Sequence, residues 1–406
     1  MTDFARSTHP GVQAQLDRLS MTSPLGDRLG LERIGQLLER LGRPQDGLAP
    51  VFHIAGTNGK GSTVALLRAA MEAAELKVHA FTSPHLVRFN ERIRIAGALI
   101  EDEPLEALLA EVIGAGAGIE PSFFEVAAAV AILAFAREPA DSVILEVGLG
   151  GRLDATNVID RPAVCGIASI GLDHQQHLGD TLAEIAAEKA AIARRRVPLV
   201  SLAQGTEAEA AIIATSEAAG ARLWLEGRDW AADPNLVPAL PGAHQVRNAN
   251  LAWQMLATQH AVDVPREAFV TGLRTATWPA RFQRLTDGPL TSGLETYVDG
   301  AHNGDAAAAL AAHLAATGPM HVILGVLANK NAGEIIRLLR PHALSMTFVP
   351  VADHDHHDPA ALAEHFGARA AANLTEALAA LPAPRLIAGS LYLAGEALAL
   401  NRELPS

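Results

Sequence analysis

Short apolar runs alternate with longer amphipathic segments along the first two thirds of the chain. The runs with the length and composition of buried strands lie at residues 51–54, 78–81, 143–147, 164–170 and 197–202. Between them, apolar residues recur at helical spacing, as in Phe123 to Arg137 and in Thr181 to Arg196. We expect Asp180 or Thr181 to cap the second of these helices, with Glu184 in its first turn. This alternation predicts a doubly wound α/β domain with a mostly parallel sheet, whose ligands gather at the carboxyl ends of the strands.

The same pattern restarts in the last third of the chain. Strand-like runs at residues 295–298, 321–326, 345–349 and 386–388 are separated by alanine-rich helical segments. Proline, glycine and aspartate concentrate around residues 279–289, which marks a linker. We therefore predict two domains, at residues 1–284 and 285–406. The expected fold class is α/β, with a larger domain built on a mostly parallel sheet first and a smaller Rossmann-like domain after it.

Composition narrows the possible functions. The chain has 406 residues, of which 49% are hydrophobic and 19% charged, so it is long enough for two cores. A formal net charge of -13 argues against a general polyanion-binding surface, and we expect no nucleic-acid partner. Cys165 is the only cysteine, which excludes an intrachain disulfide and a cysteine zinc cluster and suits a reducing cytosol. With no apolar signal core and no uncharged run long enough to span a bilayer, we expect a cytoplasmic monomer without a membrane partner.

The segment from Val51 to Thr63 passes from an apolar run through a glycine-rich turn into a helical pattern. Glycines allow a close backbone approach to an anion, and the amides that open the helix point at it. Lys60 adds a positive charge, and Ser62 or Thr63 offers a hydroxyl to Mg²⁺. The general nucleotide-loop pattern is met imperfectly, because Gly61 stands where Ser or Thr normally follows the lysine. An ordinary strand-to-helix turn is the alternative, but the combined Lys, Ser and Thr favour a phosphate-binding loop.

Two further strands end in polar side chains that suit a cation site. Glu146 closes an otherwise apolar strand, and a carboxylate there requires a cation, either Mg²⁺ or a salt-bridge partner such as Arg152. Asp173 and His174 follow the next strand. His174 is able to ligate a metal through one ring nitrogen, although a histidine in such a loop more often makes a hydrogen bond.

The loop after residues 78–81 combines Ser83 and His85 with Arg88, Arg92 and Arg94. Arginines pair well with carboxylates and phosphates, but taken alone these three are typical of a solvated face. The triplet Arg194–Arg196 is expected to end a helix, where cations complement the dipole. The Asp- and His-rich segment at residues 353–359 is expected to be a solvated loop with incidental metal affinity.

Taken together, several segments resemble the folylpolyglutamate synthase and dihydrofolate synthase family, within the ATP-dependent amino-acid ligases that include the peptidoglycan Mur enzymes. The resemblance is nearly chain-long and rests on independent motifs in one order. They are Gly56-Thr-Asn-Gly-Lys-Gly-Ser62, Thr82-Ser-Pro-His85, Phe123-Phe-Glu125, Leu145-Glu-Val-Gly-Leu-Gly-Gly-Arg-Leu-Asp-Ala-Thr-Asn157, Leu172-Asp-His174, Glu188-Lys-Ala190, Pro279-Ala-Arg-Phe282 and Asp299-Gly-Ala-His-Asn303.

The resemblance implies ATP and Mg²⁺ as cofactors, which would make the first domain a P-loop ATPase domain, and it assigns residues to each. The implied nucleotide contacts are Gly56, Thr57, Asn58, Gly59, Lys60, Gly61, Ser62, Thr63, Asn248, Arg281 and Asp299. The implied metal ligands are Ser83, Glu146 and His174, and the implied catalytic residues are Lys60, Lys189, Asp299 and His302.

Lys189 is implied to be carbamylated, whereas its immediate sequence reads as a surface lysine near Glu184 and Glu188. Arg281 and Asp299 are expected on either side of the interdomain linker, so that closure of the two domains brings them to one nucleotide.

The resemblance also assigns pterin contacts to Phe123, Phe124, Glu125, Leu153, Asp154 and Ala155. Adjacent aromatics at a helix start are able to stack on a flat ring, but core packing at a helix end explains them equally well. A further pterin segment of the family, commonly Asp-Leu-Gly, reads here as Arg28-Leu29-Gly30, and this departure bears on pterin selectivity.

The activity implied is ATP-dependent addition of L-glutamate to dihydropteroate, to reduced folates, or to both, through an acyl phosphate. A Mur-type ligase with a nucleotide-linked acceptor is one alternative. An NTP-binding regulatory switch without ligase chemistry is another, although it would need no second substrate site.

Overall fold

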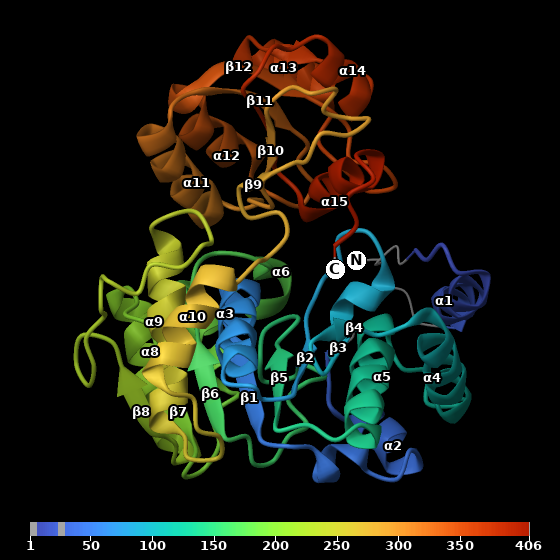
Figure 1. Ribbon diagram of the computed structural model, residues 1–406, viewed down its shortest axis with the longest axis vertical. Helices are drawn as coiled ribbons and strands as arrows, with labels where there is room; N and C mark the ends of the chain where they lie inside the picture. Colours follow the sequence, from blue (N-terminus) through green and yellow to red (C-terminus); the bar gives the residue numbers. More distant parts are fainter. Residues whose placement is uncertain (1–5, 23–28, 406) are drawn as a thin grey trace. The chain divides into compact units, whose positions relative to one another are not determined.

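The computed structural model describes residues 6–22 and 29–405. By contacts between residues, the chain forms two compact units (Figure 1). The first comprises Met1–Ala239 and Gln245–Ala276, and the second comprises Leu240–His244 and Thr277–Ser406. Arg28 lies outside the described residues. Within the described part of the chain, no helix has both the length and the hydrophobicity needed to cross a bilayer.

In the described part of the first unit, eight strands form one sheet in the order β4-β3-β2-β5-β1-β6-β7-β8. Their bounds are β1 Val51–Ala55, β2 Val78–Phe81, β3 Ile93–Ile95, β4 Ala98–Leu99, β5 Ser142–Glu146, β6 Val164–Ile167, β7 Pro198–Ser201 and β8 Arg222–Leu225. The strands from β2 to β8 in this order are parallel, and only β3 and β4 at one edge pair antiparallel. The predicted strands and the mostly parallel sheet are confirmed, although β6 ends at Ile167 rather than at residue 170.

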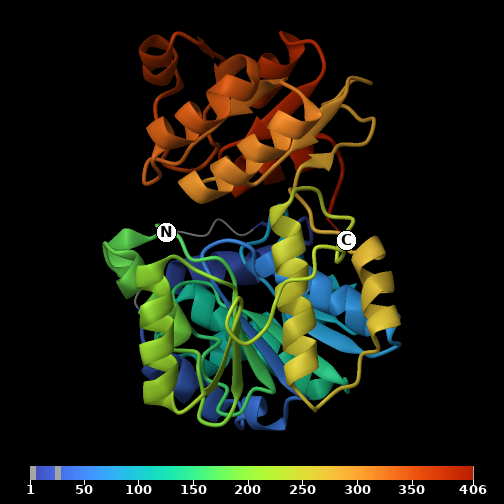
Figure 2. The ribbon, with the colours of Figure 1, turned by 90° about the vertical axis from the view of Figure 1, so that its left-hand side faces the viewer.

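Helices cover both faces of this sheet. They are α1 Pro10–Thr22, α2 Glu32–Arg40, α3 Lys60–Ala73, α4 Asp102–Ala115, α5 Phe123–Arg137, α6 Gln175–Leu178, α7 Leu182–Ala190, α8 Thr206–Ala219, α9 His244–Thr258 and α10 Arg266–Thr275, with the short 3₁₀ helices η1 Pro44–Gly47 and η2 Phe89–Arg92. One core cluster joins residues of α1, α2, α4 and α5 to β2 and β5, and another joins α7 and α8 to β6 and β7. Figure 2 looks onto α8, α9 and α10.

Capping explains where two of the helices begin. Ser122 and Glu125 form a capping box at the start of α5, and Thr181 and Glu184 form another at the start of α7, as expected for Thr181. The prediction that the second helix continues to Arg196 is wrong, because α7 ends at Ala190. The guanidinium of Arg194 instead donates to backbone carbonyls of residues 191–193 and of Asn157, so it satisfies carbonyls of the turn that follows the helix.

In the described part of the second unit, six strands form a smaller sheet in the order β13-β12-β11-β14-β10-β9, parallel except for β9. Its strands are β9 Gln283–Arg284, β10 Thr296–Val298, β11 Met320–Leu324, β12 Ala343–Phe348, β13 Arg369–Ala370 and β14 Arg385–Ala388. Its helices are α11 Gly304–Thr317, α12 Ala332–Leu339, α13 Pro359–Phe366, α14 Leu374–Ala379 and α15 Leu391–Leu400, with η3 Arg340–His342. Since β9 already pairs with β10, the described sheet includes residues 283–284. The domain division between residues 284 and 285 stays a prediction.

Candidate active site at the carboxyl edge of the large sheet

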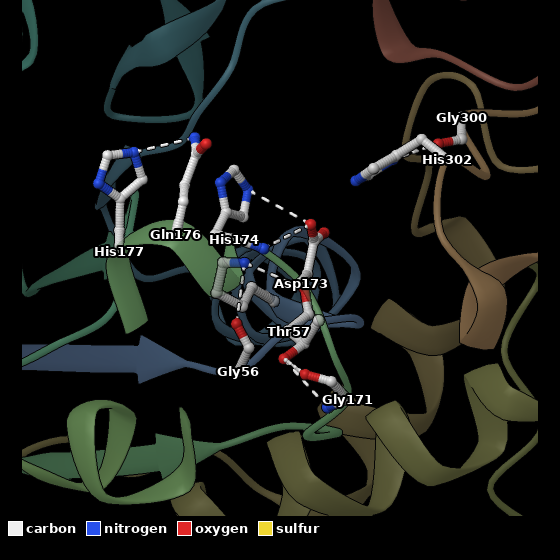
Figure 3. Close-up of polar contacts among 10 residues, drawn as sticks. Gly56, Thr57, Gly171, Asp173, His174, Gln176, His177, Gly300 and His302 are labelled. Carbon is white, nitrogen blue, oxygen red and sulfur yellow. Dashed lines mark hydrogen bonds and ion pairs between the residues drawn. The ribbon is translucent and has the colours of Figure 1, made fainter. Parts of the chain in front are cut away.

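The glycine-rich segment after β1 folds into a compact loop that leads into α3. Gly59 precedes α3 with φ +90°, a conformation that favours glycine. The amides of Thr57 and Asn58 both donate to the Ser169 carbonyl, at 2.7 and 3.2 Å, so the loop is fastened to the segment after β6. The Thr57 hydroxyl adds a contact to Gly171 at 3.0 Å (Figure 3). The first turn of α3 is thereby held at the carboxyl edge of the sheet, where its free amides suit an anion.

The polar side chains of this loop have distinct partners. The ammonium of Lys60 donates to the carbonyls of Gly56 and Thr57 at 3.1 and 3.3 Å, so it curls back over the loop. The Thr63 hydroxyl donates to the Gly59 carbonyl at 2.9 Å. The hydroxyl of Thr63 is therefore used in a hydrogen bond at the start of the helix, and of the two hydroxyls we expect that of Ser62 to contact a bound ligand.

Gly59 is a position where a methyl group is poorly tolerated. A Cβ there would lie 2.4 Å from Oδ1 of Asn248, a buried residue of α9. We expect Gly59→Ala to raise the KM for ATP about tenfold or more, because the left-handed backbone costs on the order of 1–2 kcal/mol and the clash moves Asn248 or the loop. Gly227→Ala is the matched control, since Gly227 has φ +84° and a Cβ added there would meet no described heavy atom within 4 Å. Equal effects of both substitutions on the KM would mean that the contact with Asn248 is unimportant.

Three parallel strands bring the predicted metal ligands to the same edge. Ile54 of β1 pairs with Glu146, and Phe81 of β2 pairs with Leu145, so the residues after these strands emerge together. Glu146 is buried, and its Oε2 accepts the amide of Ser83 at 3.2 Å. The alternative partner, Arg152, instead makes a 2.8 Å ion pair with Glu188. The described contacts therefore give no support to a Glu146–Arg152 salt bridge.

His174 follows β6 with φ +53°, and its amide donates to Asp173 Oδ1 at 2.8 Å. Its ring Nε2 lies 3.9 Å from the same oxygen (Figure 3). Among the described residues there is no cluster of three or more His, Cys, Asp or Glu side chains that would hold a metal alone. The carboxylate and the hydroxyl suit Mg²⁺, which prefers oxygen ligands, usually keeps several waters and takes further ligands from substrate phosphates, whereas the imidazole of His174 is a less usual ligand for it.

Lys189 is buried, so its interpretation as a surface lysine is wrong. α7 turns it inward, and its helix backbone packs against Gly151, where a Cβ would lie 2.8 Å from the Lys189 carbonyl oxygen. Burial is the main cause that lowers the pKa of Lys189 to about 7, the charge of Lys60 contributes in the same direction, and Asp173 opposes the shift. The neutral amine is thus well populated at physiological pH, which is the form that reacts with CO₂.

The arginines of the loop after β2 are not a solvated face. Arg92 is fully buried, and its Nε donates to Nδ1 of His85 at 2.8 Å. Its guanidinium carbon lies 5.7 and 5.5 Å from the ring centres of Phe89 and Phe123. Arg94 is half-buried, and burial lowers its pKa to about 10. The hydrogen bond to His85 and the two aromatic rings compensate the desolvation of the Arg92 guanidinium. The sequence pattern alone does not reveal these partners.

The predicted acceptor residues of α5 are partly engaged in packing. Phe123 makes an edge contact with Phe89, with ring centres 5.9 Å apart. Phe124 packs on Gly148, where a Cβ would lie 2.3 Å from its ring. Glu125 is buried, with Oε2 accepting from the Ser122 amide at 2.6 Å and from Arg33 at 3.1 Å. Its Oε1 is buried without a hydrogen-bond partner among the described residues, and a ligand donor would satisfy it.

Asp154 organises the loop between β5 and β6. Its Oδ2 accepts the amides of Gly148 and Leu149 at 3.0 and 2.9 Å, and its Oδ1 accepts the Thr156 amide at 2.9 Å and hydroxyl at 2.5 Å. Burial raises the pKa of Asp154, while these donors lower it. These hydrogen bonds of Asp154 set the conformation of the loop, and therefore also the positions of its neighbours Leu153 and Ala155.

The second unit holds the remaining candidates. Asp299, after β10, accepts the amides of Phe282 and Ala301 at 2.8 Å each, and burial raises its pKa against the charge of Arg281. His302 Nδ1 contacts the Gly300 carbonyl at 2.8 Å (Figure 3).

Arg281 and Asp299 belong to the same unit, so the expectation that they lie on either side of the linker is wrong. The pairing of β9 with β10 joins the two segments, and with it the argument that they need domain closure to converge disappears.

The segment at residues 353–359 has exposed aspartates, as expected for a solvated loop, but its histidines contact neighbouring residues. His354 stacks on Tyr392 with ring centres 3.8 Å apart, and His357 Nε2 contacts the Lys330 carbonyl at 2.9 Å. His356 pairs with Leu327 in an isolated bridge. Its histidines are engaged within the second unit.

Comparison with known proteins identifies the family. The Mur ligase, glutamate ligase domain matches residues 280–391. A dihydrofolate synthase/folylpolyglutamate synthase of Bacillus subtilis (strain 168) is 35% identical over 357 residues, covering 80% of this chain and 81% of the relative. The chain belongs to the dihydrofolate synthase/folylpolyglutamate synthase family. Its members are ATP-dependent ligases of the Mur ligase superfamily that add glutamate to folates, which confirms the predicted enzyme class.

Solved structures of the family agree with the fold. Escherichia coli FolC in complex with DHPP and ADP matches with a TM-score of 0.84 at 30% identity, over 95% of this chain and 97% of that one. The bifunctional folylpolyglutamate synthase/dihydrofolate synthase of Yersinia pestis, complexed with AMPPNP and Mn ion, matches with a TM-score of 0.86 at 30% identity, over 97% and 98%. The predicted fold class and the use of ATP with a divalent cation are thereby confirmed. The roles of the individual residues stay predictions.

Proposed function

We propose that this chain joins L-glutamate both to dihydropteroate and to reduced folates, using the carboxyl edge of the large sheet as its ATP site. The observation that carries this proposal is the convergence of the phosphate loop, Glu146 and the buried Lys189 at that edge. Lys60 and Lys189 are close enough for the charge of one to lower the pKa of the other. An ordinary strand-to-helix turn has no need of two lysines and a buried carboxylate at one end of a sheet.

The reaction proceeds in two displacements. A carboxylate oxygen of the folate acceptor attacks the γ-phosphorus of ATP, the bond to the β-phosphate oxygen breaks, and ADP leaves. The amine of L-glutamate then attacks the acyl carbon, the bond to the phosphate oxygen breaks, and the nitrogen loses a proton as the amide forms. Negative charge moves across the phosphoryl group in the first step, so fixed positive charge is the main contribution expected from the protein.

The first unit supplies that charge and positions the nucleotide. Residues 56–63 receive the phosphates on backbone amides, and Lys60, once a phosphate displaces it from the Gly56 and Thr57 carbonyls, neutralises the transferring group. Ser62 offers its hydroxyl, and Asn248 presents Oδ1 beside Gly59. Ser83, Glu146 and His174 would hold Mg²⁺, which supplies Lewis-acid stabilisation of the phosphates when bound.

Replacing Glu146 by glutamine is expected to raise the Mg²⁺ concentration for half-maximal activity about tenfold or more, with a smaller change in the acceptor KM. The amide keeps the shape of the buried side chain but removes the charge that a hard cation prefers. Glu111→Gln is the matched control, because the exposed Glu111 of α4 pairs with Arg137 outside the site. An unchanged magnesium titration for Glu146→Gln would show that the carboxylate is structural.

The acceptor is assigned to Phe123, Phe124, Glu125 and residues 153–155. The Oε1 of Glu125, unsatisfied within the described chain, supports a ligand with N–H donors at this position, as a pterin ring has. The partly exposed Phe123 and Phe124 offer ring surface for stacking. Asp154 is fully hydrogen-bonded within its loop, so we assign it to loop shape as much as to direct contact.

In the second unit, Arg281, Asp299 and His302 are assigned to the nucleotide and to glutamate transfer. Their support is a shared location: Phe282, next to Arg281, donates to Asp299, and His302 follows three residues later. We further propose that the enzyme is a cytoplasmic monomer acting on small molecules, with neither nucleic acid nor membrane as a partner. Size-exclusion chromatography with light scattering tests the monomer.

The decisive experiment is ADP release with ATP and L-glutamate and one acceptor at a time. Dihydropteroate and tetrahydrofolate should each support turnover, with a glutamylated product detected by mass spectrometry. Turnover with only one of them would restrict the proposal to one activity. Turnover with a nucleotide-linked muramyl acceptor would instead indicate a peptidoglycan-type ligase, and ATP hydrolysis without any acceptor would indicate a regulatory switch.

A further inference from the structure

His53 is a fully buried imidazole in the middle of the strand that leads into the phosphate loop, and none of the roles above uses it. It pairs in register with Leu145 of β5 and Cys165 of β6, so both neighbours in the sheet are apolar. Burial, together with a smaller contribution from the charge of Arg194, lowers its pKa to about 3. A neutral imidazole in such a place still needs a hydrogen-bond partner for its N–H.

That partner is Thr156. Nε2 of His53 lies 2.8 Å from Oγ1 of Thr156, and the same hydroxyl donates to Oδ1 of Asp154 at 2.5 Å. Because the threonine hydroxyl has one hydrogen and gives it to the carboxylate, it accepts from His53, whose Nε2 therefore carries the proton. The three side chains form a directed relay from β1 to Asp154, and all three are buried.

The relay ends where the proposed acceptor site begins. Asp154 turns the backbone after β5 by accepting the amides of Gly148 and Leu149. Phe124 rests on Gly148, so the position of that backbone also sets the position of a proposed acceptor-stacking ring. A displacement of Asp154 would therefore move both the loop after β5 and the ring of Phe124.

A second set of contacts holds the far side of the loop. Asn157, directly after Thr156, accepts from the Arg194 guanidinium through its side chain at 2.7 Å and its carbonyl at 2.9 Å. Two charged groups outside the relay act on its members: Arg194, after α7, lowers the pKa of His53, and Lys189, on α7, interacts with the carboxylate of Asp154. With this anchor in place, loss of the relay should shift the loop locally rather than unfold it.

We propose that His53 and Thr156 are positioning residues for acceptor binding, through which the strand of the phosphate loop fixes the carboxylate of Asp154 and the backbone of residues 148–155. The inference rests on the proposed acceptor site. It adds a buried side-chain connection to the β1–β5 pairing that already joins the strand before the phosphate loop to the strand before the acceptor loop. The distance between these two loops matters for catalysis, because the acceptor carboxylate has to approach the γ-phosphorus in line.

The test is steady-state kinetics of the full-length enzyme with four single variants. Thr156→Val removes the hydroxyl with little change of shape, and His53→Leu removes the donor. Both should raise the KM for the folate acceptor about tenfold or more while leaving the KM for ATP within about twofold. Thr156→Ser and His53→Gln keep an accepting hydroxyl and a donating N–H, and both should stay near the wild type.

A double variant separates positioning from stability. Thr156→Val leaves the buried N–H of His53 unpaired and should lower the melting temperature, whereas His53→Leu combined with Thr156→Val removes both partners and should recover much of it. The acceptor KM of the double variant should remain raised. Recovery of the KM together with stability would overturn the proposal, as would equal changes in the KM for ATP and for the acceptor.

Thr347→Val is the matched control. Thr347 lies in β12 of the second unit, and its buried hydroxyl has no hydrogen-bond partner in the described part of the chain, so its loss should change neither KM. If Thr156→Val fails to fold, His53→Leu against His53→Gln decides the same question. Failure of the proposed function shows separately, because the wild type would then release no ADP with either pteroate or folate acceptor.

Discussion

Replacing Lys60 by alanine is expected to lower kcat by about 10²–10³-fold while leaving the fold intact, because a charge aimed at a transferring phosphoryl group is among the largest single contributions to such reactions. The ammonium contacts two carbonyls of its own loop, at 3.1 and 3.3 Å, and the residue is not part of a core. Its loss should therefore cost little stability. Circular dichroism and the melting temperature check the fold, and single-turnover ADP formation checks the chemistry.

Lys77→Ala controls for the removal of one positive charge from the acidic chain. Lys77 is exposed immediately before β2, outside the site, and should be replaceable without effect on kcat. Near-normal turnover by Lys60→Ala would show that the glycine-rich segment is not a phosphate-binding loop in this protein. A loss of turnover that accompanies loss of the folded structure would place Lys60 among the structural residues instead.

Much of the first unit is predictable because its signals are local. Apolar runs in the sequence place β1, β2, β5, β6 and β7 to within a few residues, since buried parallel strands need continuous apolar side chains. The glycine at residue 59 likewise indicates a turn with a positive φ, which the structure has there. The positions of residues at or directly after the ends of such strands are fixed by the sheet. The strand pattern therefore places Ser83 and Glu146 at one edge, where the Ser83 amide contacts the Glu146 carboxylate.

The errors concern burial, which depends on partners distant in sequence. Lys189 reads as a surface lysine between glutamates, yet α7 packs it inward against the loop after β5. Arg92 reads as one of three solvated arginines, yet it lies among His85, Phe89 and Phe123. A polar residue within an apolar run was the available signal for His53, but its partner is 103 residues away in the chain.

The placement of Arg281 and Asp299 shows a different limit. Proline and glycine mark a linker between them, but the same residues also suit the turns of a small sheet, and β9 forms there. Composition cannot distinguish a flexible connection from an edge strand, because β9 exists only through its pairing with β10, and composition does not show which segments pair. The hydrogen bond from Phe282 to Asp299 is the contact that decides it.

Replacing Lys189 by alanine is expected to lower kcat about a hundredfold, with partial recovery when a small carboxylate such as acetate is added. The reason is the state of the side chain: its pKa of about 7 leaves the amine neutral often enough to attack CO₂, forming a carbamate and releasing a proton. A carbamate converts this position from a cation beside Lys60 into an anion, and so turns a repulsive pair into an attractive one. Acetate bound in the vacated space would restore that negative charge.

The same pKa gives the reaction a pH and CO₂ dependence with a definite sign. Below pH 7 the ammonium predominates and cannot react, so depletion of CO₂ should slow the wild type most near pH 6–7 and least above pH 8, where the amine captures residual CO₂. In CO₂-free buffer the folded state binds fewer protons than the unfolded chain between about pH 7 and 10.5, so this lysine makes stability rise with pH across that window and Lys189→Met should remove the rise. Native mass spectrometry should detect the added group on wild type but not on Lys189→Ala. Full activity of Lys189→Ala, or rates that ignore CO₂ at every pH, would leave Lys189 without a catalytic role.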